Sequence, residues 1–438
     1  KNIFYKGSCM IKVNELLKTD QEHIESITSA FLPPIAVVSL SQDAAAVLIP
    51  SVSIGDTVLE GQIIGKDSES NACIHSPIPG TVTDIFTASM PNGKRVPSIS
   101  IKLNGAFSYL GKKTEKASWI YSPSTQRLKH LCEMGVINTF DVPQTLSKQM
   151  ESVLKKQDGF LAVRLFDKDP SVQSETCTAE QYVHEILEGS ALIADTINAS
   201  SVFFLYSSNN WYVPQDTDVK MHFKSTPVYF IPVETSLYPQ GGSVEITELI
   251  NKYLQKNYKK KTGSIVLAVD GSAALASYNA VVKNIPYIEK IVHVTGDCIK
   301  KQGMYKVRIG TPIRNLLQES QGFVSEPAKI VINGLIKGIA VSDLNTPITK
   351  YVNSITVLSS KDFPDQRQTP CIRCGRCHEV CPASIQPEKI YFHYFSDVSI
   401  PDYVLNTAKL CTECALCNAV CPSRLPLYQT IKLVQGKK

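Results

Sequence analysis

The sequence predicts a multidomain protein of mixed α/β and β architecture. Three patterns indicate it: short strands between turn residues near the N-terminus, strands alternating with helices in the middle, and two cysteine-rich loops in a helical C-terminal segment. At 438 residues the chain is long enough for several domains of roughly 100–200 residues each. We predict four domains, which cover residues 1–118, 119–286, 287–360 and 361–438.

Residues 31–105 contain short apolar runs broken by Gly, Pro and Ser, a pattern typical of a small β-sandwich or barrel. The expected strands are Ile35–Leu40, Ala45–Ile49, Thr57–Ile64, Thr81–Phe86 and Ser98–Leu103. The stretch from Val52 to Val82 resembles the barrel-sandwich hybrid of biotinyl and lipoyl domains. Those domains carry a modifiable lysine at a hairpin tip, but no lysine lies between Lys66 and Lys94. The resemblance therefore predicts the scaffold without the swinging-arm function.

Residues 120–285 alternate between apolar strands and stretches with helical periodicity. The expected strands are Gly159–Phe166, Ser201–Leu205, Val228–Val233 and Ser264–Ala268. The expected helices are Leu146–Lys156, Ala179–Ile197, Val244–Gln255 and Ala273–Lys283. Such alternation predicts βαβ units and a parallel sheet.

Residues 286–355 return to short strands, which predicts a small α+β module. Its expected strands are Ile291–Thr295, Tyr305–Ile309, Ala328–Ile332 and Ser354–Leu358, with one helix at Pro312–Gln318. The C-terminal segment is expected to be helical outside its cysteine loops, at Pro387–Tyr394 and Asp402–Leu410.

The composition excludes several functional classes. Hydrophobic residues make up 43% of the chain and charged residues 19%, as in ordinary globular proteins. The net charge of +5 is mild, and no basic patch interleaved with aromatic residues suggests nucleic-acid binding. No apolar run approaches the ~18–20 residues that a membrane span needs. Five cysteines outside the C-terminal runs are scattered and odd in number, which argues against disulfides and fits a reducing compartment.

Two cysteine runs dominate the C-terminal segment, and each follows the pattern C-x2-C-x2-C-x3-C-P. This is the run of two-cluster ferredoxins, in which the fourth cysteine of each run ligates the other cluster. Zinc knuckles and disulfides are the alternatives, but they rarely use this run twice. The sequence therefore predicts two 4Fe-4S clusters that transfer single electrons. The expected ligand sets are Cys371, Cys374, Cys377 and Cys421 for one cluster, and Cys411, Cys414, Cys417 and Cys381 for the other.

Read in order, seven short motifs resemble RnfC, a subunit of the Rnf-type ion-translocating electron transport complex. They are Tyr5-Lys6-Gly7, Gly80-Thr81-Val82, Tyr238–Gly242, Val294–Asp297, Ile309–Pro312, Thr346–Lys350 and Cys371–Cys377. The resemblance implies a barrel-sandwich hybrid, an α/β domain like the flavoprotein subunit of respiratory complex I, a β-grasp module of the SLBB type and a two-cluster ferredoxin domain. It also implies a peripheral subunit on the cytoplasmic face of the membrane, in contact with flavin-bearing membrane subunits.

The chain departs from this family at the nucleotide-binding loop. The family loop reads G-x-G-G-A-G-F-P-T, and its glycines let backbone N–H groups approach flavin and nicotinamide phosphates. Only one glycine remains in the matching stretch Gly135–Thr145, where Asn138, Thr139 and Phe140 add Cβ atoms. Asp141 adds a negative charge, and like charges at about 4 Å repel by about 1 kcal/mol even in water.

Three further family motifs have also diverged. The sequence has Asp167-Lys168-Asp169-Pro170 for E-C-E-P, Val269–Ser272 for N-V-G-T, and Asn333–Gly338 for G-G-P-M-M-G. We therefore expect the α/β fold to persist without nucleotide binding. Flavin retained without NADH, and a divergent working pocket, are the alternatives. In either alternative, the resemblance assigns cofactor binding to Tyr238, Gly241, Gly242, Asp167 and Asp169.

We expect a peripheral electron-input subunit without catalytic residues of its own. It would relay electrons from ferredoxin or flavodoxin, which are usually acidic, to membrane subunits that carry flavin. Arg373, Arg376 and Arg424 are the expected docking cations, although they could instead stabilise the clusters or contact a membrane subunit. Two other functions stay open: an FMN-containing NADH dehydrogenase subunit of the same complex, and a soluble flavoenzyme like cobalamin reductases.

Overall fold

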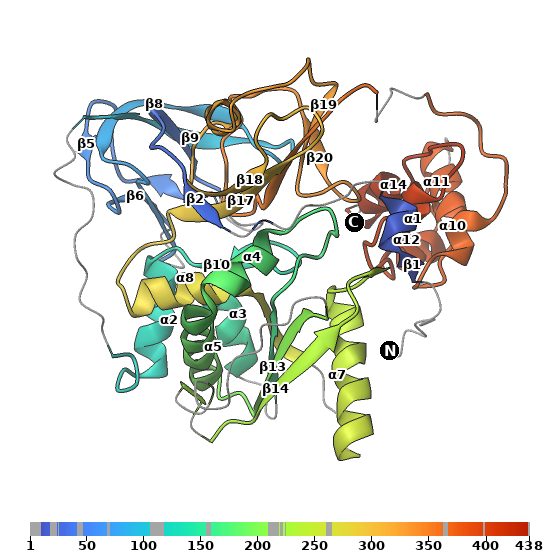
Figure 1. Cartoon of the computed structure of the whole chain (residues 1–438), viewed down its shortest axis with the longest axis horizontal. Coiled ribbons are helices and arrows are strands. Elements are labelled where there is room, and N and C mark those ends of the chain that lie inside the picture. Colours follow the sequence, from blue (N-terminus) through green and yellow to red (C-terminus); the bar gives the residue numbers. More distant parts are fainter. Residues whose placement is uncertain are drawn as a thin grey trace.

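The computed structural model describes residues 10–17, 24, 26–41, 47–67, 71–105, 118–154, 159–208, 219, 222–223, 225–259, 265–361, 367–396 and 399–436. Its strands and helices form a β-rich unit near the N-terminus, an α/β unit, a second sheet and a helical C-terminal unit (Figure 1). The Tyr5-Lys6-Gly7 motif lies outside the described residues. The domain boundaries predicted from the sequence stay predictions.

The N-terminal unit consists of two small sheets around one apolar core. The first sheet has the order β3 (Ile35–Ser39), β9 (Arg95–Leu103), β8 (Gly80–Ser89) and β5 (Thr57–Val58). The second has the order β4 (Ile49–Pro50), β6 (Ile63–Lys66) and β7 (Cys73–His75). The single strand predicted at Thr57–Ile64 is divided, because a turn intervenes at Gly61, whose φ of +77° favours glycine. The strand β7 was not predicted.

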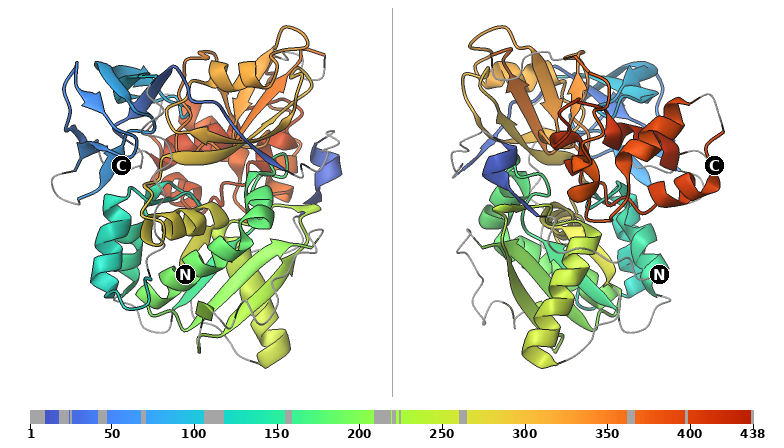
Figure 2. Two further views of the ribbon diagram at one scale, coloured as in Figure 1. Left: turned by 60° about the vertical axis from the view of Figure 1, so that its left-hand side comes forward. Right: turned by 90° about the vertical axis from the view of Figure 1, so that its right-hand side faces the viewer.

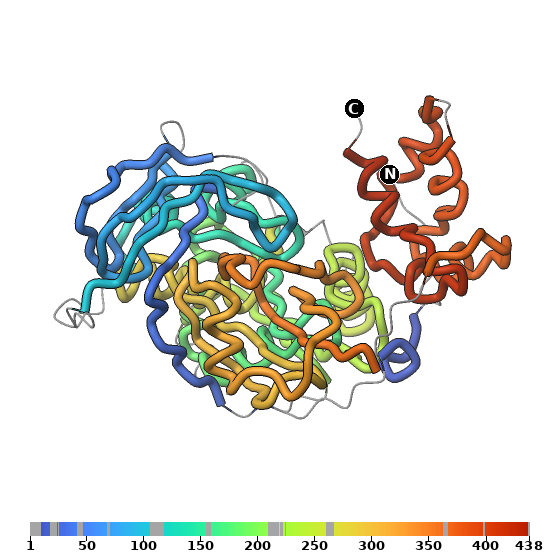
Figure 3. Tube along the Cα trace, turned by 90° about the horizontal axis from the view of Figure 1, so that it is seen from above, coloured from blue at the N-terminus to red at the C-terminus, as the bar shows by residue number. Residues whose placement is uncertain are grey.

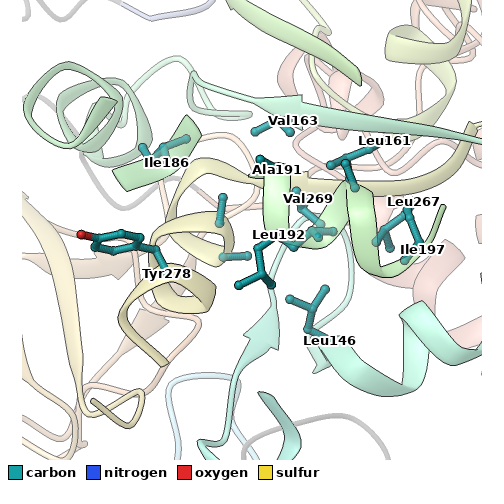
Figure 4. Packing of buried hydrophobic residues seen from close by; sticks show 14 of the residues in the cluster. Leu146, Leu161, Val163, Ile186, Ala191, Leu192, Ile197, Leu267, Val269 and Tyr278 are labelled. Atoms are coloured by element: carbon teal, nitrogen blue, oxygen red, sulfur yellow. The ribbon is translucent and has the colours of Figure 1, made fainter. Parts of the chain in front are cut away.

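The α/β unit contains a four-stranded parallel sheet, as predicted. Its order is β14 (Val228–Val233), β13 (Ser201–Ser207), β12 (Phe160–Arg164) and β16 (Ile265–Asp270). Side chains of α2 (Ser124–Glu133), α3 (Leu146–Leu154), α5 (Val183–Thr196) and α8 (Gly271–Val281) form one core with this sheet (Figure 4). The helix α7 (Ser243–Tyr258) contributes to a second core with the same strands. Burial on both faces explains the continuous apolar runs of the strands.

One long helix predicted at Ala179–Ile197 is instead two helices. The helix α4 (Ser174–Gln181) ends before Tyr182, whose ψ of 33° departs from helical geometry, and α5 follows. The carboxylate of Asp167 accepts hydrogen bonds from the backbone N–H groups of Glu175 and Thr176 at 3.1 Å. These bonds satisfy donors of the first helical turn and fix an earlier start than the apolar periodicity predicts.

The second large sheet is mixed and six-stranded. Its order is β2 (Ile27–Ser29), β18 (Gly303–Arg308), β17 (Glu289–Thr295), β21 (Ser354–Leu358), β19 (Lys329–Ile332) and β20 (Ile339–Val341). The helix α9 (Ile313–Glu319) packs on the same core. The edge strands β2 and β20 were not predicted, and β2 comes from the N-terminal arm.

The same N-terminal arm joins the α/β unit and the C-terminal unit. The strand β1 (Ile11–Lys12) pairs antiparallel with β15 (Leu237–Tyr238), and α1 (Val13–Leu16) follows directly. Apolar side chains of the arm pack in one cluster with Tyr238, Cys414 and Leu416. The tube view shows the start of the described chain beside the C-terminal helices (Figure 3).

The C-terminal unit is a helical bundle in which one pattern occurs twice (Figure 2, right). Each cysteine run passes into a one-turn helix and then a longer one. These are α10 (Arg376–Glu379) and α11 (Pro387–Phe395) after the first run, and α13 (Leu416–Ala419) and α14 (Leu427–Gln435) after the second; α12 (Asp402–Ala408) lies between them. Left-handed residues precede the short helices, Gly375 at φ 77° and Ala415 at φ 58°. The repeated backbone gives both cysteine loops the same local geometry.

Candidate metal centres and the adjoining cavity

The first three cysteines of the first run share a cavity with the last cysteine of the second run. Cys371, Cys374 and Cys377 line it together with Cys421. The backbone N–H of Arg373 donates to the sulfur of Cys371 at 3.4 Å. Cys374 is exposed, so this first thiol set lies at the surface.

The second thiol set contains Cys411, Cys414 and Cys417, and Cys381 from the first run lies beside them. Burial raises the pKa of the Cys414 thiol to about 12, and the neighbouring thiols of Cys411 and Cys381 act in the same direction. The backbone N–H of Glu413 donates to the sulfur of Cys411 at 3.4 Å, as Arg373 does in the first set. Cys414 and Cys417 are buried, so the second set lies deeper in the molecule.

The two thiol sets fit iron–sulfur ligation in their chemistry. All eight candidate ligands are cysteines, and iron–sulfur clusters are held by thiolates. Ligation requires deprotonated sulfur, so thiols with raised pKa release protons when a cluster binds. Within the described ranges, no group of three or more Cys, His, Asp or Glu side chains is arranged to hold a single metal ion.

A separate cavity brings the diverged motifs of the α/β unit together. It is lined by residues from the former glycine loop, from the Asp167–Pro170 motif and from the Asn333–Gly338 loop. The lining includes Thr139, Phe140, Asp141, Arg164, Asp167, Lys168, Asp169, Asn333, Lys337, Tyr351 and Asn353. Three of the four sequence departures thus meet at one place, and the fourth contributes Asp270, which pairs with the lining residue Arg164.

Arg164 ties these motifs to one another. Its Nη2 lies 2.6 Å from Oδ1 of Asp270, and both side chains are buried. The guanidinium also donates to the backbone oxygens of Phe140 and Gly241 and lies 4.3 Å from the centre of the Phe140 ring. A buried charge pair of this kind is strongly destabilised if only one partner is removed.

Asp141 places its negative charge at the N-terminus of α7. Its carboxylate accepts hydrogen bonds from Lys168 at 2.7 Å and from the hydroxyl of Ser243, the first residue of α7. Burial raises the pKa of Asp141, but Lys168, the hydroxyl of Ser243 and the Arg164 guanidinium together more than offset this, and the pKa lies below its usual value. A helix N-terminus favours anions, and here an internal carboxylate occupies that position.

The two predicted aspartates line the cavity but bond to the protein itself. Asp167 caps α4, and burial raises its pKa. Asp169 accepts hydrogen bonds from the backbone N–H of Ser171 at 3.0 Å and of Ile336 at 2.9 Å. A Cβ at Gly334 would lie 2.2 Å from Cγ of Asp169, so this loop contact requires glycine.

The other three predicted cofactor residues do not line the cavity. Tyr238 is buried and donates its hydroxyl hydrogen to the backbone oxygen of Cys414 at 2.7 Å. Gly241, at φ 83°, and Gly242 form the turn before α7. The Tyr238 turn therefore supports the second cysteine loop. Sequence reasoning missed Arg164, whose only signal was a lone cation inside an apolar strand.

Glu175 connects the cavity to a second buried ion pair. Its carboxylate lies 3.8 Å from Nζ of Lys290, and both side chains are buried. Burial and the nearby Asp270 carboxylate raise the pKa of Glu175 to about 7, although the Lys290 ammonium acts in the opposite direction.

The raised pKa of Glu175 predicts a pH-dependent stability. The folded protein binds this proton more tightly than the unfolded chain, so the free energy of unfolding should fall as pH rises from about 4.5 to about 7. In Glu175→Gln this contribution, at most about 3 kcal/mol, should vanish. Burial lowers the pKa of His75 to about 3 and of His293 to about 4, which destabilises at low pH in both proteins. The measurement is therefore the difference in denaturation free energy between wild type and variant; a difference that does not change with pH contradicts the prediction.

Two family models match the chain. The RnfC barrel sandwich hybrid domain matches residues 13–106, and the 4Fe-4S dicluster domain matches residues 370–425. The C subunit of the proton-translocating ferredoxin:NAD(+) oxidoreductase complex of Clostridium ljungdahlii is 26% identical over 83% of this chain and 79% of that protein. The chain is therefore similar to RnfC over most of its length.

Other relatives and one solved structure extend the comparison. The C subunit of the ion-translocating oxidoreductase complex of Rhodobacter capsulatus is 25% identical over 81% of this chain and 69% of its own length. The chain spans only 48% of the corresponding protein of Pectobacterium carotovorum, to which it is 25% identical over 82% of its length. A crystal structure of an NAD+-reducing NiFe hydrogenase has a TM-score of 0.47 and 11% identity, over 76% of this chain and 70% of that chain. Among the helices that the structure describes, none has the length and apolarity to cross a bilayer.

Proposed function

We propose that this chain is an electron-transfer subunit of an ion-translocating oxidoreductase complex and binds two 4Fe-4S clusters. Cys371, Cys374, Cys377 and Cys421 ligate the first cluster, and Cys411, Cys414, Cys417 and Cys381 ligate the second. The observation that carries the proposal is the exchange of fourth cysteines between the two thiol sets. When bound, the clusters supply one-electron redox chemistry, and the protein contributes thiolates and backbone N–H groups near sulfur.

The α/β unit serves as a scaffold in this proposal and does not oxidise NADH. Asp141 occupies the N-terminus of α7, and Arg164 joins the former glycine loop to the turn at Gly241. A phosphate at this position would meet the Asp141 carboxylate, and the Lys168 ammonium that could compensate is already paired. The same contacts argue against FMN, which leaves the two clusters as the cofactors.

Electrons enter at the first thiol set in this proposal. Arg373, Arg376 and Arg424 are exposed around it, and Ile372 is 67% exposed. An apolar side chain among cations suits an acidic one-electron carrier such as ferredoxin or flavodoxin, because opposite charges accelerate encounter. The second thiol set lies inward, against Tyr238. Electrons then leave towards membrane subunits, with the chain bound at the cytoplasmic face.

Comparing donors tests this function. In the anaerobically reconstituted chain, reduced ferredoxin or flavodoxin should bleach the clusters, whereas NADH should not. Rapid bleaching by micromolar NADH would favour the alternative, an FMN-containing NADH dehydrogenase subunit. The rate with the acidic carrier should fall as salt rises, because screening shortens electrostatic fields to ~8 Å at physiological ionic strength.

Charge reversal locates the docking surface. Arg373→Glu with Arg376→Glu should slow reduction by the carrier roughly tenfold or more at low salt, with unchanged iron content. Lys252→Glu with Lys256→Glu is the matched control, because it makes the same change in net charge on the exposed side of α7. Equal slowing by both double variants would mean that net charge matters and that these arginines form no docking site.

A further inference from the structure

Lys337 lies between the cavity of the α/β unit and the second thiol set. It lines that cavity, and its backbone N–H, with that of Ile336, points at the Asp169 carboxylate at 3.4 Å and 2.9 Å. The neighbouring side chain of Ile336 packs in the apolar cluster that contains Cys414. The loop is therefore held against the second cysteine run.

The ammonium of Lys337 is a largely buried cation beside that run. Its Nζ lies 5.8 Å from the centre of the Tyr428 ring, which packs against the cysteines of the C-terminal core. The carboxylates of Glu413 and Asp141 act on Lys337, but each is paired with another lysine: Glu413 is 2.5 Å from Lys432, and Asp141 is 2.7 Å from Lys168. Burial lowers the pKa of Lys337 to about 8, so most of it is charged at pH 7.

The first thiol set has a negatively charged residue beside it, in contrast to the Lys337 cation beside the second set. The sulfur of Cys377 donates to Oε2 of Glu388 at 3.2 Å, and Glu388 lines the cavity of that set. Arg373, Arg376 and Arg424 are also near, but they are exposed, and water and salt screen exposed charges. The Glu388 carboxylate thus contacts a sulfur of the first set, whereas at the second set the Lys337 ammonium acts on Cys411 beside a Glu413 carboxylate that is paired with Lys432.

We propose that Glu388 and Lys337 set a step in reduction potential between the two clusters, with the second cluster the better electron acceptor. Reduction adds one negative charge, which a nearby cation stabilises and a nearby carboxylate opposes; net charge around a cluster is a known determinant of its potential. When bound, the clusters would supply one-electron chemistry, and Glu388 and Lys337 would favour passage of an electron from the first thiol set to the second. No bond or proton changes hands in this transfer.

This difference in reduction potential rests on the proposed function. It depends on a residue at which this chain departs from RnfC. The matching motif of RnfC, G-G-P-M-M-G, has methionine where this chain has Lys337. The charge beside the second thiol set is therefore one of the departures from the family. Lys337 and Glu388 act as positioning residues, through the cysteines that they neighbour.

A redox titration of the full reconstituted chain, followed by electron paramagnetic resonance, tests the step. Lys337→Met should shift the equilibrium between the two reduced clusters about tenfold towards the first, which equals about 59 mV for one electron. Lys337→Arg should keep the wild-type potentials. Lys409→Met is the matched control, since Lys409 is exposed and only two residues before Cys411.

Glu388→Gln provides an independent test. It should raise the reduction potential of the first cluster and so reduce the difference in potential between the two clusters. The proposal is contradicted if both Lys337→Met and Glu388→Gln leave the reduction potentials unchanged. It is also contradicted if Lys409→Met shifts the potentials as much as Lys337→Met does. Either result would leave the proposed function intact if the wild-type chain binds about eight irons and gives the paramagnetic resonance signals of two clusters. A wild-type chain with one cluster or none would instead overturn the proposed function.

Discussion

Cys381→Ala is expected to remove the cluster of the second run while that of Cys371, Cys374 and Cys377 stays. Cys381 belongs to the first run by sequence, but its thiol is close enough to act on the pKa of Cys411, Cys414 and Cys417. The variant should lose about four of about eight irons, because each cubane contains four. Iron and sulfide quantification after anaerobic reconstitution measures the loss, and electron paramagnetic resonance identifies the remaining cluster.

Two further cysteine variants serve as controls for Cys381→Ala. Cys421→Ala should produce the opposite loss, since Cys421 shares a cavity with the first set. Cys298→Ala should retain all iron, because Cys298 is buried in the core of the six-stranded sheet. Selective loss of the first cluster in Cys381→Ala would show that each run ligates its own cluster.

Arg164→Met should destabilise the α/β unit by about 3–5 kcal/mol, because it leaves Asp270 buried without its partner. The Asp270 side chain is 1% exposed, so water cannot replace the guanidinium. The substitution also removes the donors to the backbone oxygens of Phe140 and Gly241. Chemical denaturation followed by circular dichroism gives the change in free energy of unfolding.

A double variant separates charge from packing. Arg164→Met with Asp270→Asn should recover part of the lost stability, since removing both charges costs less than removing one. Lys252→Met is the control; it breaks an exposed pair with Glu248 at 3.8 Å and should change stability by less than about 0.5 kcal/mol. A double variant no more stable than Arg164→Met would mean that Asp270 is not the reason for the loss.

The sequence predicted the elements whose pattern is local. The strand Val228–Val233 was predicted to the residue, because it is a short continuous run rich in β-branched and aromatic residues. The strands β1 and β2 were not predicted. They are two and three residues long, and they exist because distant partners, β15 and β18, offer free edges.

The same distinction applies to the site. Cysteine spacing alone predicted both thiol sets, since the chemistry of a cubane fixes the loop. The motifs that line the cavity were each identified separately in the sequence. Asp167 and Asp169 do line the cavity. The pair of Arg164 and Asp270 was not predictable, because 106 residues separate its members and neither belongs to a pattern. From the sequence, Tyr238 was interpreted as part of a turn, whereas its hydroxyl donates a hydrogen bond to the backbone oxygen of Cys414.

The shared cavity of Cys371, Cys374, Cys377 and Cys421 also bears on the order of events at the ribosome. The first three thiols are synthesised 44 residues before the fourth, since Cys377 and Cys421 are residues 377 and 421. At roughly 5–20 residues per second, they wait about 2–9 s for their partner. During that interval the nascent chain exposes an incomplete thiol set, which oxidants and stray metals can reach. Loading of the first centre must therefore wait for Cys421, whereas the second set is complete once Cys417 is made. A truncation after residue 420 should yield a protein that can hold the second cluster but not the first.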